Sequence, residues 1–152
     1  MSNIESLVAE LKSIDQQRDD ESYAMDFEAV LAKFIELRSS AIIGPLIDFF
    51  DDEAPFDEVM FSIIHTIETF EDETYVRGLL EKAASFCESS PRWAAIVFMR
   101  VLNADATQHE LVRQLREAND ATKAAVRNLM EKINARGVQF VAKTTPVLVA
   151  AS

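Results

Sequence analysis

The sequence contains little cysteine, histidine, glycine or proline, and each shortage excludes a class of protein. One Cys and two His in 152 residues cannot form an intramolecular disulfide or supply the ligands of a typical zinc site. Three Gly and four Pro disfavour a loop-rich or β-rich fold and leave little material for a glycine-based phosphate loop. We therefore expect no structural metal, no disulfide framework and no cofactor.

Long hydrophobic runs are also missing. A membrane-spanning helix needs about 18 to 20 consecutive apolar residues, and the nearest runs are interrupted by Asp48, Glu68 and Arg100. The first eleven residues are acidic and amphipathic, without the basic start and apolar block of a secretory signal. The sequence therefore predicts a cytoplasmic protein that does not enter membranes.

Positive charge is scarce, with 15 Lys and Arg against 26 Asp and Glu and a formal net charge of −11. Repulsion between like charges disfavours direct binding to nucleic acids or anionic membranes and favours basic partners. Residues 1–90 contain 21 Asp and Glu and 6 Lys and Arg, whereas residues 91–152 contain 5 and 9. The negative charge is therefore concentrated in the first part of the chain.

Apolar residues recur at helical spacing from residue 3 to about residue 136. The expected helices, about eight in number, cover residues 3–14, 27–37, 40–50, 55–70, 73–88, 92–102, 107–115 and 120–136. Connections this short place consecutive helices antiparallel. We expect an all-α fold. About half of the residues are apolar, which is enough to form the core of a single domain over residues 1–137.

Several helix ends carry sequence signals. Gly44-Pro45 is expected to kink the third helix or delay its start, and Ser90-Pro91 to begin the sixth. Thr107 and Glu110 have the spacing of a capping box that opens the seventh helix. Asp120 can cap the eighth helix, and Gly137 can end it.

A weak internal similarity relates the middle of the chain to itself. A shift of 34 residues aligns Gly44 with Gly78, and Ile63 with Val97. The two hairpins that result, about 40–70 and 73–103, predict a short solenoid of stacked antiparallel hairpins. The stretch 42–70, with its proline-bearing first helix, is similar to a single HEAT-type repeat.

The C-terminal tail, residues 138–152, departs from this pattern. Its valines, Phe140, Pro146 and lack of acidic residues favour extended backbone over helix. The alternatives are a segment packed across the last helices, a disordered tail, or a strand added to the edge of a sheet in a partner or a second copy.

Candidate catalytic groups are few. His65 is surrounded by isoleucines and is expected at the edge of the core, His109 is expected to be exposed, and Cys87 to be a buried, inert thiol. The carboxylates from Asp48 to Glu58 lack the alternating ligands and central glycine of an EF-hand. We therefore expect neither enzyme activity nor a bound metal; a small enzyme with a carboxylate-bound metal is a third hypothesis.

Carboxylates gather at two bends between expected helices. The first acidic bend consists of Asp48, Asp51, Asp52, Glu53, Asp57 and Glu58, and the second of Glu68, Glu71, Asp72 and Glu73. Such residues are often only solvated or cap helices, but like charges this close also repel one another, which a cationic partner would relieve. Aromatic and proline residues lie nearby, of which we expect at most two to be exposed: Phe49, Phe50, Pro55, Phe56 and Phe70.

Three features together suggest a family: the first helix with Ile4 and Leu7, the HEAT-like hairpin 42–70, and the block from Ser90-Pro91-Arg92-Trp93 to Leu102-Asn103. The chain resembles the small all-helical bacterial immunity proteins of polymorphic toxin and contact-dependent growth inhibition systems. The resemblance implies a cytoplasmic inhibitor that binds one cognate toxin domain and blocks its active site. The sequence does not determine the oligomeric state, and a monomer is favoured in the complex. Many such toxins are nucleases with basic clefts.

These observations lead to one hypothesis and one alternative. The chain is predicted to neutralise a toxin, with an RNase favoured, by pairing the carboxylates of the two acidic bends with Lys and Arg of the toxin. The alternative is a HEAT-like adaptor or scaffold that binds a basic partner without inhibiting it.

Overall fold

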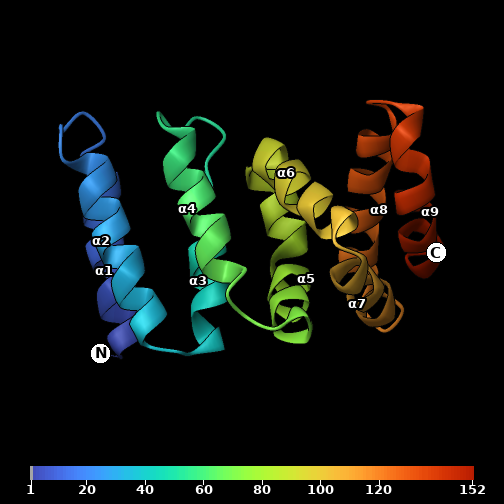
Figure 1. Ribbon diagram of the computed structural model, residues 1–152, viewed down its shortest axis with the longest axis horizontal. Helices are drawn as coiled ribbons and strands as arrows, with labels where there is room; N and C mark the ends of the chain where they lie inside the picture. The colour runs from blue at the N-terminus through green and yellow to red at the C-terminus, as the bar shows by residue number, and fades with distance from the viewer. Residues whose placement is uncertain (1) are drawn as a thin grey trace. The chain divides into compact units, whose positions relative to one another are not determined.

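The computed structural model describes residues 2–152, and within that range every regular element is a helix (Figure 1). The α-helices are α1 (Asn3–Asp15), α2 (Tyr23–Glu36), α3 (Ile43–Ile47), α4 (Asp57–Ile67), α5 (Asp72–Ser89), α6 (Pro91–Asn103), α7 (Asp105–Leu115), α8 (Asp120–Asn134) and α9 (Val141–Ala150). Two 3₁₀ turns precede α3 and α9, namely η1 (Ser40–Ile42) and η2 (Val138–Phe140). The predicted all-α fold is confirmed. None of the helices described is both long enough and apolar enough to cross a membrane.

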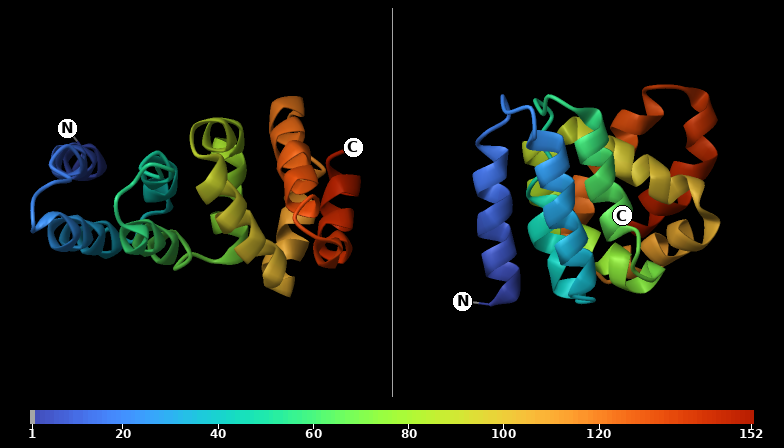
Figure 2. Two further views of the ribbon diagram at one scale, coloured as in Figure 1. Left: turned by 90° about the horizontal axis from the view of Figure 1, so that it is seen from above. Right: turned by 60° about the vertical axis from the view of Figure 1, so that its left-hand side comes forward.

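The chain divides into two compact units, unit 1 up to Phe70 and unit 2 from Glu71 onward. In unit 1, α2 packs against α1 and α4, and α4 packs against α3. The helices therefore form two hairpins, with α1 and α3 in one layer and α2 and α4 in the other (Figure 2, left). This packing confirms the stacked antiparallel hairpins expected from the sequence, whereas the single domain over residues 1–137 stays a prediction.

Burial within unit 1 is uneven. The α2 residues Tyr23, Phe27 and Phe34 are at most 1% exposed, and α4 adds the fully buried Met60 and Ile63. Burying a side chain of this size contributes about 1.5 to 3 kcal/mol. By contrast, Leu11 is the one buried residue of α1. The second layer therefore supplies most of the core of this unit.

Unit 2 is built around α5 and α8. Helix α5 packs against α6, α7 and α8, and α9 packs against α7 and α8. The centre holds the fully buried Trp93 and Phe98 of α6, Leu115 of α7, and Val126 and Met130 of α8. The almost entirely apolar α6 is thus buried, as its sequence predicts.

The start of the third helix follows the sequence signal. Ser39 accepts a hydrogen bond from the Ala41 amide at 3.2 Å and opens η1. Pro45 then lies inside α3, which has only 5 residues. The delay expected at Gly44-Pro45 is therefore observed, and α3 is a short helix.

Two predicted caps are wrong. Helix α7 begins at Asp105, so Thr107 lies inside it, 8% exposed, and its hydroxyl donates to Asp72 Oδ1 at 2.7 Å. Helix α8 is capped by Asn119, whose side chain accepts from the Thr122 amide at 2.8 Å, and not by Asp120. In the first case a tertiary hydrogen bond replaces the local one, and in the second the preceding residue has the extended backbone that a cap requires.

The expectation of extended backbone for residues 138–152 is also wrong, because η2 and α9 occupy this stretch. Several contacts hold α9 in place. Gln108 donates to the Lys143 carbonyl at 2.9 Å, the Thr144 hydroxyl donates to Asn134 at 2.7 Å, and Arg127 donates to the Ala151 carbonyl at 2.9 Å. These contacts, with the burial of Val147, outweigh the intrinsic β preference of valine and threonine.

Candidate functional site

The first acidic bend connects α3 to α4 in unit 1. Asp51 shapes the loop, since its carboxylate accepts a hydrogen bond from the Glu53 amide at 2.9 Å, the geometry of an Asx turn. Asp57 and Glu58 lie in the first turn of α4, where negative charge stabilises the positive end of the helix dipole. Some of the predicted partner-binding carboxylates therefore also have a structural role.

A single arginine links this loop to another one. Arg18, in the connection between α1 and α2, contacts Asp51 at 2.8 Å and Asp15 at 3.2 Å. Tyr23 donates its hydroxyl to Asp15 at 2.9 Å. The α1–α2 and α3–α4 connections lie at the same end of unit 1 (Figure 1). We call this group, Asp15, Arg18, Tyr23 and Asp51, the Arg18 clasp.

The clasp shifts the pKa values of its members. Partial burial acts to raise the pKa of Asp51, but the Glu53 amide and the Arg18 guanidinium outweigh it and hold that pKa below its ordinary value. Partial burial likewise acts against the charged form of Arg18, yet hydrogen bonds to Asp15 and Asp51 keep its pKa above the ordinary value. Burial, followed by the hydrogen bond to Asp15, raises the pKa of Tyr23 to about 12.

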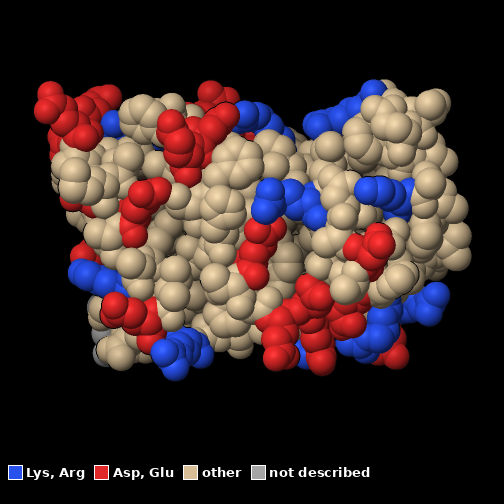
Figure 3. Space-filling view, in the orientation of Figure 1, with Lys and Arg blue, Asp and Glu red and all other residues tan. Residues whose placement is uncertain are grey.

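The shared end brings in carboxylates that the sequence analysis did not select. Asp19, Asp20 and Glu21 occupy the α1–α2 connection and Asp26 the first turn of α2, all of them exposed. Figure 3 shows acidic side chains over the helix ends of unit 1. The acidic end of unit 1 is defined as Asp19, Asp20, Glu21, Asp26, Asp51, Asp52, Glu53, Asp57 and Glu58. The run Arg18-Asp19-Asp20-Glu21 is visible in the sequence as a cluster of charge. Its proximity to the loop between α3 and α4 could not be read from the sequence.

Two exposed apolar side chains lie at or near this end. Phe56 caps α4 and is 44% exposed, its ring 6.2 Å from that of Tyr23. Met25 of α2 is 74% exposed. Phe49 and Phe50 are buried, at 8% and 4% exposure. The sequence analysis expected at most two exposed residues among the four phenylalanines and one proline near the acidic bends. Two of these five, Pro55 and Phe56, are exposed.

Glu68 lies away from the acidic end. It is the C-cap of α4, so the full length of an 11-residue helix, roughly 16 Å at 1.5 Å per residue, separates it from Asp57. Asp48 follows α3 as its C-cap and is exposed. The structure of unit 1 therefore gathers the loop and first-turn carboxylates and leaves Glu68 apart.

In unit 2, the remaining carboxylates of the second acidic bend begin α5. Glu71 is the N-cap, and Asp72 and Glu73 lie in the first turn. Asp72 accepts the Thr107 hydrogen bond, Glu73 pairs with Arg77 at 2.8 Å, and the Glu73 carbonyl accepts from Gln114 at 2.8 Å. This start of α5 is thus tied to α7 by hydrogen bonds.

The sequence matches the family model for Immunity protein 30 over residues 13–111, which is more than half of the chain. The chain belongs to this family. The match covers the Arg18 clasp, the acidic end of unit 1 and the start of α5, and it confirms the resemblance to immunity proteins of toxin systems. No curated protein and no solved structure matches the chain.

The residues considered for chemistry in this immunity protein are dispersed. His109 is exposed as expected, whereas His65 is exposed and not at the edge of the core. Cys87 is half-buried, and burial raises the pKa of its thiol despite the opposing effect of Lys132. Among residues 2–152, no three His, Cys, Asp or Glu side chains are grouped so that they could hold a metal ion.

Proposed function

We propose that this immunity protein neutralises its cognate toxin by placing carboxylates in the basic cleft of a nuclease, with an RNase favoured. It acts by binding and not by catalysis. The carboxylates assigned to pair with Lys and Arg of the toxin are Asp51, Asp52, Asp57, Glu58, Glu71, Asp72 and Glu73, with Asp48, Glu53 and Glu68 as further members of the two bends.

The charge of unit 1 is the observation that carries this proposal. Residues up to Phe70 include 16 Asp and Glu and 4 Lys and Arg, so cations of the same unit cannot neutralise most of these carboxylates. The Lys and Arg side chains of a nuclease cleft attract the phosphates of its substrate. A surface of clustered carboxylates attracts the same Lys and Arg side chains. The charge pattern therefore favours a nuclease over a toxin with a neutral or acidic active site.

The geometry refines the assignment. Asp51 is held by Arg18, which it shares with Asp15, and Glu73 is held by Arg77, so both carboxylates already have a cationic partner. The exposed Asp19, Asp20 and Glu21 lie at the same end of unit 1 as the first acidic bend. We therefore include them in the proposed contact, with Phe56 as an apolar anchor beside the charges.

Copurification gives the first test. The chain is coexpressed with the toxin domain encoded by the adjacent reading frame, and a stable complex that suppresses RNA cleavage by that domain is expected. A complex that leaves cleavage of every nucleic acid unchanged would contradict the nuclease assignment. Failure of the two proteins to associate would contradict the choice of partner.

A charge-reversal variant tests the surface. Glu21→Lys, Glu53→Lys and Glu58→Lys change three exposed carboxylates of the acidic end. A matched control reverses Glu88, Glu117 and Glu131, which are exposed residues of unit 2, and so changes the net charge equally. At low salt, we expect the rate of association with the toxin domain to fall by about tenfold or more for the first variant and much less for the control. Equal rates for the two variants would reject the assignment.

A further inference from the structure

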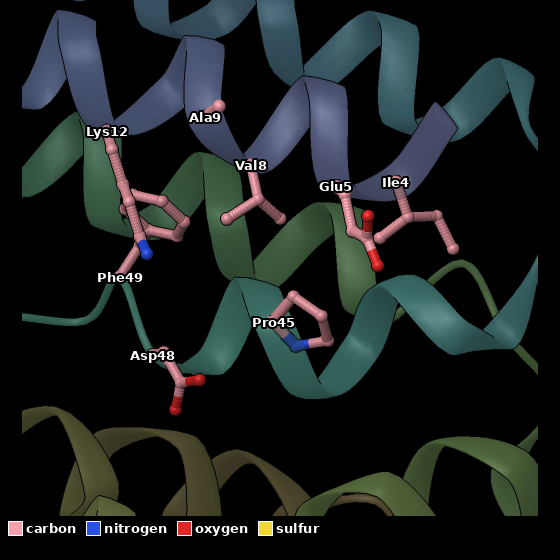
Figure 4. A pocket seen from close by; sticks show the side chains of 8 residues that line it. All are labelled: Ile4, Glu5, Val8, Ala9, Lys12, Pro45, Asp48 and Phe49. Carbon is pink, nitrogen blue, oxygen red and sulfur yellow. The ribbon is translucent and has the colours of Figure 1, made fainter. Parts of the chain in front are cut away.

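Unit 1 has an open groove between the two helices of its first layer. It encloses about 490 Å³ and is lined by Ile4, Glu5, Val8, Ala9, Lys12, Pro45, Asp48 and Phe49. In Figure 4, α1 forms one wall and α3 with the residues that follow it forms the other. The floor and walls are mainly aliphatic and aromatic, and charged side chains stand at the ends.

The local sequence explains why this groove is open. Helix α3 has 5 residues against 13 in α1, so it covers only part of the length of α1. On α1, Ile4, Val8 and other aliphatic side chains are only half-buried, because α2 covers the side that carries Leu11. Apolar surface of this kind is costly to leave in water and often marks a binding site.

We propose that this groove receives an apolar side chain from a basic surface segment of the cognate toxin domain, so that α1 helps to select the toxin. This inference rests on the proposed function and deepens it. A volume of about 490 Å³ is within the range of ligand pockets and leaves room for an apolar side chain.

Charge defines the occupant further. Lys12 and Asp48 stand near one end of the groove, and Glu5 stands beside Ile4 toward the other (Figure 4), in a unit with 12 more carboxylates than cations. Two of the three charged lining side chains are carboxylates, so a segment that directs Lys or Arg toward Glu5 and Asp48 complements this arrangement. The same unit would then attract the basic toxin through its acidic end and retain it through an apolar anchor.

The groove joins a part of the chain inside the family match to a part outside it. Pro45, Asp48 and Phe49 lie within residues 13–111, whereas Ile4, Glu5, Val8, Ala9 and Lys12 precede them. The wall contributed by α1 is therefore a feature of this chain beyond the part described by the family model. Such a wall can discriminate between toxins that share the same basic cleft.

Filling the groove tests the inference. Ala9 is exposed and faces the groove, so Ala9→Phe blocks it, and Ala29→Phe is the matched control at an exposed position of α2. Calorimetry and stopped-flow kinetics are measured with the toxin domain of the adjacent reading frame. We expect Ala9→Phe to raise Kd at least tenfold through faster dissociation, with equal helix content and Tm, and Ala29→Phe to bind as the parent does. Unchanged Kd for Ala9→Phe would overturn the inference.

A second variant decides the result if Ala9→Phe fails to fold. Glu5 forms the capping box of α1 with Ser2, and glutamine preserves that motif. Glu5→Gln is expected to weaken binding about two- to fivefold, as for an exposed ion pair, and parental affinity would overturn the inference. If both groove variants bind normally while the Glu21, Glu53 and Glu58 reversal does not, the groove is excluded and the proposed function stands. If the unmodified chain does not bind the toxin domain, the proposed function itself fails.

Discussion

The two units of this immunity protein deal with acidic residues in different ways. Unit 1 has 16 Asp and Glu and 4 Lys and Arg, whereas unit 2 has 10 and 11. In unit 2 the charges are nearly balanced, and short-range pairs connect them, as between Glu73 and Arg77 and between Glu110 and Arg113. In unit 1, Arg18 contacts two carboxylates at once.

This difference separates two reasons for having acidic residues at helix starts. Asp72 and Glu73 in unit 2 contact Thr107, Arg77 and Gln114, so they contribute to folding. Hydrogen bonds from Arg113 and Gln114 likewise hold the pKa of Glu110 below its ordinary value. In unit 1 the excess of carboxylates cannot be balanced from within the unit. This excess is the observation on which the proposed binding to a basic toxin rests.

The largest effect is expected from removing a large buried side chain from the core of each unit. Phe34→Ala in unit 1 and Phe98→Ala in unit 2 each remove a fully buried ring and are expected to lower the free energy of unfolding by about 3 to 5 kcal/mol. Urea unfolding is followed by circular dichroism and by the fluorescence of Trp93, the single tryptophan, which lies in unit 2. A cost below about 1 kcal/mol for either variant would contradict the packing described.

Salt dependence provides the next comparison between the units. The association rate with the toxin domain is expected to fall steeply as ionic strength rises, because long-range attraction is screened. Reversal of Glu21, Glu53 and Glu58 in unit 1 should flatten this dependence, and Glu71→Gln with Glu73→Gln in unit 2 should change it less. A greater flattening by the unit 2 variant would move the principal contact to the start of α5.

Replacing the arginine of one ion pair in each unit compares how much these pairs contribute to the free energy of unfolding. Arg18→Ala leaves Asp15 and Asp51 without their shared cation, and because the Arg18 side chain is 28% exposed, we expect a loss of about 1 to 2 kcal/mol. Arg77→Ala in unit 2 breaks a pair whose side chains are 55% and 60% exposed and should cost less than about 0.5 kcal/mol. Equal costs in chemical denaturation would contradict a special role for the clasp.

The smallest effect concerns Tyr23 at high pH. The pKa of Tyr23 is raised to about 12 from an ordinary value of 10.0, so its contribution to stability is complete below pH 10 and is lost as the pH rises through 12. Tyr23→Phe is expected to cost about 1 kcal/mol at pH 8, and this difference should shrink above pH 10. A difference that stays constant up to pH 12 would contradict the assignment.

The sequence predicted the helices well because their stripes of apolar residues are continuous. Helix α4, with its row of isoleucines, and α6, with apolar residues almost all round, have such stripes, and most of their apolar residues are buried. The family could also be suggested from the order of these helices. Gly44-Pro45 correctly indicated a delayed start of the third helix, because proline limits the backbone locally, but the short length of α3 was not predicted.

The remaining features depend on contacts between residues far apart in the sequence. The tail was predicted as extended because its valines and Phe140 favour strands, yet hydrogen bonds from Gln108 and Arg127 hold it as α9. The acidic end was predicted only in part, because nothing local to Asp51 shows that Arg18 is its partner. The groove beside α1 also required knowledge of which helices share a layer.

The Arg18 clasp fixes the shape of a surface as well as the stability of a fold. Loops that order only on binding lose conformational entropy, at about 0.5 to 1.5 kcal/mol for each flexible side chain immobilised. Arg18, Asp15 and Asp51 already hold two loops in one arrangement. The acidic end is thereby preorganised. In the proposed complex, the rate of association would therefore be limited by the encounter between the two proteins and not by rearrangement of these loops.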